Sequence, residues 1–426
     1  MTQPSTAPAA PDPTPQLVVR SHPVDSVDGV SADLLDHLPA ENPLAWIRRG
    51  DGIVGWGRAA SLRVTGADRF ADAEDWWHRL TASAVVRDEV AVPGSGLVAF
   101  GSFAFTDDGE SVLEVPEVVV GRRGGKTWLT TISPASWLVA PPNLVRRTST
   151  PAGDVTFADG ARSGAEWTGI VADAVQRIGS GVVEKVVLAR DLIAYADRPI
   201  DPRRPLHRLA AAYPACWTFS VDGLIGATPE LLVRREKGLI TSRVLAGTIR
   251  RTGDDAHDLA LAASLARSSK DLEEHEFAVR SVADALLPHC QSMLVPETPF
   301  VLHLPNVMHL ATDVTGVAAN GASALGLAAA LHPSAAVCGT PTPVARDLIA
   351  ELEGMQRGRF SGPVGWMDAG GDGEWCIALR CGQIDPDDPA RMRLFAGAGI
   401  VAGSNPVAEL AETNAKLIPM RDALGI

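Results

Sequence analysis

The sequence predicts an α+β fold, because stretches typical of strands and stretches typical of helices both recur along the chain. Between residues 17 and 147, short apolar runs such as GLVAFGSFAF and SVLEVPEVVVG alternate with Gly and Asp turns, which is the pattern of strands. Residues 184–195, EKVVLARDLIAY, are also rich in β-branched residues and predict a strand. Residues 223–251 predict a hairpin with the tripeptide EKG at its turn.

Three segments predict the helical part of the fold. Residues 166–181 combine helical apolar spacing with closing glycines, which is typical of a helix and its C-cap. Residues 256–287 carry leucine or valine at intervals of seven, which predicts one long helix with a buried stripe. Residues 404–424 predict a final helix that is capped by Ser404 or Asn405 and has a proline in its first turn.

Length and composition indicate a globular protein with a large core, since 46% of the 426 residues are hydrophobic. We expect a disordered tail at residues 1–16, then a strand-rich lobe at 17–147 and a second region at 160–426, together forming one compact two-lobed domain. The net charge of −13 argues against a general affinity for nucleic acid. The start of the chain resembles neither a signal peptide nor a membrane anchor. Five cysteines without a CxxC pair suggest reduced thiols, so we expect a cytoplasmic protein. We also expect a monomer.

Lys185 is the first residue that could carry chemistry. The two-residue period of a strand places it on the same side as Val187 and Ala189, so its amine would point into a partly apolar site. An amine in such a site loses its proton more readily, which is what a general base requires. The alternative is an ordinary strand lysine whose stem packs while its ammonium group stays in water.

Glu230 is the second candidate and lies in the segment ATPELLVR. The preceding proline would keep the backbone extended and present the carboxyl group at the start of a strand. In an apolar pocket this carboxyl would remain protonated and could serve as a general acid. A surface salt bridge is the alternative.

Three further carboxylates suggest a metal site. Glu409 and Glu412 are three positions apart on the predicted final helix, hence on one face and near its positive end. Glu274 lies in the segment SKDLEEHE of the predicted long helix. Carboxylates without histidine or cysteine at ligand spacing suit Mg²⁺. The alternative is a solvated acidic face in which Glu412 pairs with Lys416.

Three more residues suggest an anion-binding or ligand-binding role. Arg380 shares a predicted strand face with small residues in GEWCIALRC, which leaves room for a carboxylate; an ion pair at the strand end is equally possible. Gly397 lies in AGAGIVAGS, where glycines permit close approach of a ligand or a tight bend. His309 is a lone histidine among apolar residues, and a hydrogen-bonded core histidine is the alternative to a functional one.

The order and wording of these segments resemble the chorismate-utilising enzyme family over roughly residues 160–426. The blocks that carry the resemblance are KVVLAR, TPELL, LAGT, SKDLEEHE, LHPSAAVCGTP, GEWCIALRC and AGAGIV. The N-terminal third resembles the family only weakly. The resemblance implies a fold like that of anthranilate synthase component I, with layered, largely antiparallel sheets, helices outside and a central cleft. It also implies that residues 160–426 form the chorismate-binding catalytic region.

The resemblance assigns a role to each candidate. It implies that Lys185 activates a water molecule and that Glu230 protonates a departing hydroxyl group. It implies Mg²⁺ as the cofactor, placed by Glu274, Glu409 and Glu412. The residues that would line the substrate are Gly247, Thr248, His309, Arg380, Gly397 and Lys416.

Within the family, two positions favour an isochorismate synthase, a Mg²⁺-dependent isomerase of the hydroxymutase type. Members that use ammonia lack the lysine seen here as Lys185, and aminodeoxychorismate synthases carry a lysine where this chain has Ala246. The expected reaction adds water at C2 of chorismate and removes the C4 hydroxyl, for menaquinone or siderophore biosynthesis. One alternative is a salicylate synthase, which shares Lys185 and Glu230 and then eliminates pyruvate. Another is a non-catalytic chorismate-binding protein, which would be expected to lack the base, the acid or the metal carboxylates.

Overall fold

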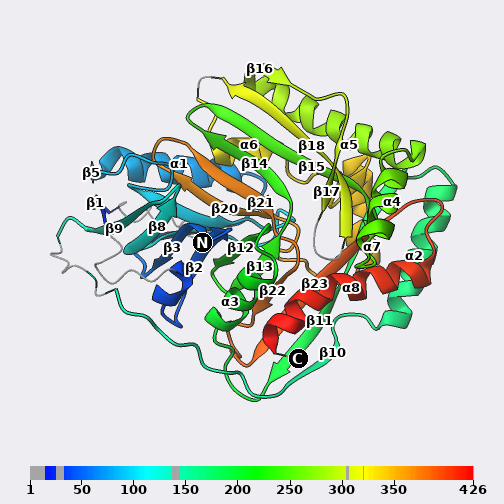
Figure 1. The fold of residues 1–426 in the computed structure, drawn as a ribbon, viewed down its shortest axis with the longest axis horizontal. Coiled ribbons are helices and arrows are strands. Elements are labelled where there is room, and N and C mark those ends of the chain that lie inside the picture. Colours follow the sequence, from blue (N-terminus) through cyan, green and yellow to red (C-terminus); the bar gives the residue numbers. More distant parts are fainter. Residues whose placement is uncertain are drawn as a thin grey trace, which may run out of the picture.

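Two large β-sheets packed face to face form the framework of the protein (Figure 1). The structure is a computed structural model, and it describes residues 15–24, 33–136, 142, 144–303, 307–319 and 321–425, apart from the side chains of Lys270 and Glu274. Within these residues the first sheet has 13 strands and the second has 10. The predicted N-terminal tail lies outside the described residues as far as residue 14.

The first sheet runs through segments that are far apart in the sequence. In spatial order its strands are β10 (Val155–Asp159), β11 (Lys185–Ala196), β23 (Arg391–Ile400), β22 (Cys381–Ile384), β13 (Leu224–Thr228), β12 (Trp217–Val221), β2 (Leu44–Arg48), β3 (Asp51–Trp56), β8 (Val118–Arg123), β9 (Lys126–Pro134), β1 (Leu17–Pro23) and β5 (Val85–Asp88), with β19 (Gly339–Thr340) paired to β11. Strand β1 pairs with β5 in parallel, and the other pairs among the described strands of this sheet are antiparallel.

The second sheet is antiparallel throughout its described pairs. Its strands in spatial order are β16 (Cys290–Leu294), β18 (Val307–Ala318), β15 (Leu239–Arg250), β14 (Leu231–Glu236), β21 (Gly373–Ile377), β20 (Pro363–Asp368), β6 (Val98–Ser102), β7 (Ser111–Val115) and β4 (Ala60–Val64), with β17 (Phe300–His303) paired to β18. Residues 17–147 and residues 160–426 both contribute strands to both sheets, so the two stretches share one framework.

Helices cover the outer faces of the sheets. They are α1 (Arg69–Ser83), α2 (Gly164–Gly179), α3 (Arg203–Ala212), α4 (Asp255–Leu265), α5 (Ser269–Leu286), α6 (Ala324–Ala330), α7 (Thr342–Leu352) and α8 (Pro406–Leu424), with the short 3₁₀ helices η1 (Leu34–His37) and η2 (Leu287–His289). Helix α8 packs on β23 and α5 packs on β15 and β18 (Figure 1). The predicted α+β class with largely antiparallel sheets and outer helices is therefore confirmed.

Aromatic side chains fill the space between the sheets. Trp46 and Phe219 from the first sheet and Phe100 and Trp366 from the second belong to one buried cluster. Close packing of such large side chains fixes the spacing of the two sheets, because an interior packed at crystal-like density tolerates little sliding. This core therefore sets the relative position of any group that one sheet presents to the other.

The prediction of one long helix at residues 256–287 is wrong. The structure has two helices, α4 and α5, with a turn at residues 266–268 between them. The side chain of Ser268 accepts a hydrogen bond from the backbone N–H of Asp271 and so caps a new helix. The seven-residue spacing continues across this turn, and spacing alone could not reveal the break.

Candidate active site

The site is built where the chain crosses from one sheet to the other. Strand β13 of the first sheet leads through Pro229 and Glu230 into β14 of the second. Strand β21 of the second sheet leads back through Arg380 into β22 of the first. The two crossings are hydrogen-bonded together, since Ile377 N–H donates to the Glu230 carbonyl at 3.1 Å and Ala227 N–H donates to the Arg380 carbonyl at 3.2 Å. Glu230 and Arg380 are thereby held side by side.

Arg380 is not on a strand face shared with Cys376, as the single predicted strand required. The segment GEWCIALRC forms two strands in two different sheets, and Arg380 lies between them with φ of +49°. The left-handed backbone turns the chain toward the first sheet, where Cys381 pairs with Gly226. A left-handed arginine carries a steric cost that is found chiefly at functional sites, because the surrounding structure has to maintain it.

Glu230 is half-buried, and its ionisation is strongly perturbed. Burial raises the pKa of its carboxyl group to about 7. The positive charges of Lys185, Lys416 and Arg380 lower this pKa, but by less than burial raises it. A large fraction of Glu230 is therefore protonated at neutral pH, in a place that three cationic side chains share.

Lys185 is the first residue of β11, and its side chain lies over the neighbouring strand β23 at Gly399. A Cβ atom added at Gly399 would lie 3.1 Å from Cε and 3.8 Å from Nζ of Lys185. Gly399 was missed by the sequence analysis, although it is two positions from Gly397 and hence on the same face of the strand. Its role is to leave room for the lysine.

Lys416 ties helix α8 to strand β23. Its Nζ donates a hydrogen bond of 2.8 Å to the carbonyl of Gly397 and makes an ion pair of 2.6 Å with Glu412. The pairing of Glu412 with Lys416, which was the alternative to a metal role, is thus present. It occupies one carboxylate oxygen of Glu412 and leaves the other oxygen for a further partner.

A bulge in strand β15 presents Thr248 and His309 to the same region. The register between β15 and β18 shifts at Gly247, which has φ of +75°. Beyond the shift, Thr248 Oγ1 lies 2.9 Å from His309 Nδ1. Burial lowers the pKa of His309 to about 4, and the positive charges of Arg380 and Lys416 act in the same direction. His309 is therefore a neutral hydrogen-bonding group at physiological pH.

The carboxylates proposed for Mg²⁺ are only partly described. Glu409 lies in the first turn of α8 and Glu412 lies one turn further on, close enough to His309 and Arg380 to affect their pKa values. The backbone of Glu274 lies in α5, but its side chain is outside the described part of the structure. The two described carboxylates and water are donors of the kind that Mg²⁺ prefers, so this part of the set fits the ion.

The structure thus gathers most of the predicted residues from seven places in the fold into one site. The residues linked by these contacts and electrostatic effects are Lys185, Glu230, Gly247, Thr248, His309, Arg380, Gly397, Glu412 and Lys416. An acid, a lysine and a cluster of cations in one place suit an anionic substrate that undergoes proton transfer.

The fold is that of the chorismate-binding enzymes, and the chain belongs to that family. The family model described as "Chorismate binding enzyme" matches residues 6–425. The isochorismate synthase DhbC of Bacillus subtilis (strain 168) is 41% identical over 268 residues, which cover 60% of this chain and 67% of that protein. A "salicylate biosynthesis isochorismate synthase" of Pseudomonas aeruginosa is 32% identical over 442 residues, covering 96% of this chain and 90% of that protein.

Solved structures agree with the sequence relatives. The menaquinone-specific isochorismate synthase MenF from Escherichia coli superposes with a TM-score of 0.80 at 26% sequence identity, covering 96% of this chain and 95% of the other. The resemblance predicted from residues 160–426 is confirmed, and it extends through the N-terminal third that the sequence blocks covered only weakly.

Proposed function

We propose that this protein is an isochorismate synthase, an isomerase that converts chorismate into isochorismate. The observation that carries the proposal is Glu230, a carboxyl group whose pKa is about 7 and which shares a site with Lys185. Acid–base chemistry at neutral pH needs a proton donor of this kind opposite a proton acceptor. Relatives named as isochorismate synthases support the same reaction.

In the proposed mechanism, the uncharged form of Lys185 accepts a proton from a water molecule as the water oxygen adds to C2 of the ring. The ring double bond shifts, and the C4 hydroxyl departs as water after Glu230 donates its proton. One water is consumed and one is released, so the reaction is an isomerisation. Arg380 would bind one substrate carboxylate in bidentate manner, and neutral His309 with Thr248 would orient the substrate by hydrogen bonds.

Mg²⁺ is the cofactor in this proposal, held by Glu409, Glu412 and Glu274 directly or through water. When bound, it would neutralise the ring carboxylate of chorismate.

We further propose a monomeric, cytoplasmic enzyme that supplies menaquinone or siderophore synthesis. No helix among the described residues has both the length and the apolar character needed to cross a bilayer.

Product identification tests this function directly. Purified protein incubated with chorismate and MgCl₂ is expected to form isochorismate, identified by chromatography against authentic standards. Salicylate and pyruvate as products would instead assign the salicylate synthase alternative. Removal of divalent ions with EDTA is expected to abolish turnover, and excess MgCl₂ is expected to restore it, because two substrate carboxylates must be neutralised. Full activity after EDTA treatment would contradict the role of the ion.

The pH dependence of kcat/KM should report Glu230. The acid works only when protonated, so kcat/KM is expected to fall as pH rises through about 7, the pKa to which burial raises this carboxyl group. The measurement is the initial rate at low chorismate concentration from pH 5.5 to 9. A rate that stays constant from pH 6 to 9 would show that Glu230 is not the acid.

Gly399→Ala is expected to lower kcat about tenfold with little change in stability. The added methyl group would meet the Lys185 side chain at 3.1 Å and push it by a few tenths of an ångström, and such displacements weaken a positioned base. The informative comparison is the double variant with Lys185→Ala, which should be no slower than Lys185→Ala alone. Additive effects of the two changes would mean that Gly399 acts elsewhere.

A further inference from the structure

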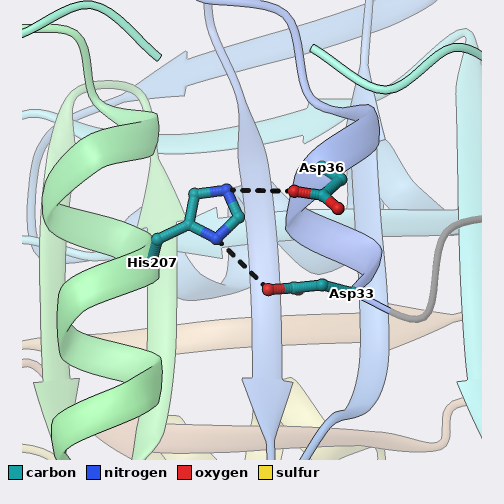
Figure 2. Close-up of side chains that lie close together, drawn as sticks. All are labelled: Asp33, Asp36 and His207. Atoms are coloured by element: carbon teal, nitrogen blue, oxygen red, sulfur yellow. Dashed lines mark hydrogen bonds and ion pairs between the residues drawn. The ribbon is translucent and has the colours of Figure 1, made fainter. Parts of the chain in front are cut away.

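A second group of side chains with metal-binding chemistry lies between η1 and α3, away from the site described above. His207 on α3 points toward η1, and a carboxylate faces each of its two ring nitrogens (Figure 2). Nδ1 lies 3.2 Å from Oδ2 of Asp33, and Nε2 lies 3.8 Å from Oδ1 of Asp36. Each of the three residues offers a ligand atom, and these atoms lie within 4.8 Å of one another. The proposed isomerisation uses none of them.

The two distances suit two different interactions. The separation of 3.2 Å between Nδ1 and Asp33 is that of a hydrogen bond. The separation of 3.8 Å between Nε2 and Asp36 is too long for a hydrogen bond. It is close to the distance between two ligands of one ion, since an imidazole nitrogen and a carboxylate oxygen bound tetrahedrally to Zn²⁺ lie about 3.4 Å apart.

The arrangement also contains the outer partner that metal-binding histidines commonly have. Such a histidine usually donates its other ring N–H to a carboxylate, which fixes the tautomer and the ring orientation. Asp33 occupies that position on Nδ1, and its other oxygen accepts the backbone N–H of Leu35 at the start of η1. Asp33 is therefore itself held in place.

We propose that His207 Nε2 and the Asp36 carboxylate bind a divalent transition cation of the zinc class, oriented by Asp33. An imidazole with a carboxylate selects Zn²⁺, Co²⁺ or Ni²⁺ over Mg²⁺, which prefers oxygen ligands alone. The chemistry of this site is thus distinct from that of the glutamates on α8. With two protein ligands, water molecules complete the coordination shell.

A cavity on the Asp33 and His207 side of the cluster offers room for some of those waters. It has a volume of about 340 Å³ and is lined by Asp33 and His207 together with Arg49, Cys216 and Thr218. The side chains of Asp33 and His207 are 51% and 29% exposed, so an ion has a route from solvent.

Arg146 competes with a metal ion at this place, where Arg122 and Arg49 also bring positive charge close to Asp33 and the adjoining cavity. Arg146 makes an ion pair of 3.1 Å with Oδ2 of Asp36, and its side chain is 77% exposed. Asp36 is only 11% exposed, so a metal ion that binds its carboxylate has to replace this ion pair. Loss of Arg146 should therefore strengthen metal binding, which a purely structural ion-pair network would not predict.

Bound metal would connect η1, in the N-terminal part of the chain, to α3, which packs on the helix α8 that carries Glu409 and Glu412. Helix α3 contacts both η1 and α8, and Arg208 on α3 donates a hydrogen bond of 2.7 Å to the carbonyl of Asp422 on α8. An ion held by η1 and α3 binds the folded chain only, so it should raise the melting temperature, by roughly 2–4 °C at saturation.

The test is calorimetric titration of the full chain with Zn²⁺ in excess Mg²⁺, which keeps the α8 carboxylates occupied. The wild type is expected to show saturable binding that disappears in His207→Gln and Asp36→Asn, weakens about 10- to 100-fold in Asp33→Asn, and tightens in Arg146→Gln. Glu412→Gln is the matched control, and its affinity for Zn²⁺ should equal that of the wild type. Melting temperatures with and without Zn²⁺ should follow the same order.

Three outcomes would overturn the proposal: no saturable binding by the wild type, equal binding by His207→Gln, or loss of binding in Glu412→Gln instead. Chorismate turnover by His207→Gln is expected to match the wild type, which verifies that this variant folds. If His207→Gln does not fold, Arg146→Gln decides, and an unchanged affinity in that variant would also overturn the proposal.

Discussion

Glu230→Gln is expected to lower kcat by about 10²- to 10⁴-fold while the protein remains folded, because the amide cannot donate an acidic proton to the departing hydroxyl. Glutamine has nearly the shape of the protonated acid, so chorismate should still bind with a similar KM. The measurement is steady-state turnover of chorismate at pH 7 in saturating MgCl₂. Glu236→Gln is the matched control, since Glu236 lies on the adjoining strand β14 and pairs with Arg123 at the surface.

The stability of the same variant provides a second, independent readout. The folded-state pKa of Glu230 is raised from 4.5 to about 7, so this group contributes stability below pH 4.5 that is lost as pH rises through about 7. Glutamine carries no charge at any pH and escapes that loss. Glu230→Gln should therefore melt at a higher temperature than the wild type at pH 8.5. Retention of most of the turnover, or an unchanged melting temperature at pH 8.5, would contradict the assignment of Glu230 as a buried acid.

Glu353→Gln is expected to destabilise the fold by about 3–5 kcal/mol, because it leaves the guanidinium of Arg357 buried without its partner charge. Glu353 and Arg357 are each 3% exposed and are joined by hydrogen bonds of 2.5 and 2.9 Å. The pair also holds the backbone of β11, since Ala189 N–H donates to Glu353 and Arg357 donates to the Val187 carbonyl. The measurement is the free energy of unfolding in urea.

Glu351→Gln is the control for this second prediction, because Glu351 lies two residues away and pairs with Arg177 at the surface. That exposed pair should contribute far less to stability than the buried one. Equal effects of the two substitutions would show that the buried pair has no special role. The lysine at the start of β11 depends on the same backbone, so Glu353→Gln should also reduce kcat at temperatures where the variant is still folded.

The sequence predicted which residues form the candidate site better than it predicted how their backbones are arranged. Lys185 and Glu230 were found because short segments around them resemble a family, and the α+β class followed from the periodicity of strands and helices. The left-handed backbone of Arg380 was not foreseen, because an arginine between apolar residues has the pattern of a continuous strand. Gly399 was missed because it contributes only the absence of a side chain, which leaves room for Lys185. The sequence does not show that the two residues are neighbours.

Other features lie beyond local patterns for a different reason. Asp33 and His207 are 174 positions apart, and each has the appearance of an ordinary surface residue until the fold brings them together. The break between α4 and α5 is set by the cap at Ser268, which competes with a spacing that favours one helix. In the first case a tertiary contact creates the cluster, and in the second a helix cap selects two helices where the spacing of apolar residues also allows one.

The paired crossings at Glu230 and Arg380 determine which part of the catalytic geometry is the most sensitive. Both residues lie between a strand of one sheet and a strand of the other, and backbone hydrogen bonds join the two crossings. If one sheet shifts slightly against the other, Glu230 and Arg380 therefore move together. Lys185 belongs to a single sheet and does not follow. If the proposed mechanism holds, thermal motion would therefore misalign the attacking water before it disturbed the leaving hydroxyl. The position of Lys185 relative to Glu230 would then depend on how rigidly the interior holds the two sheets.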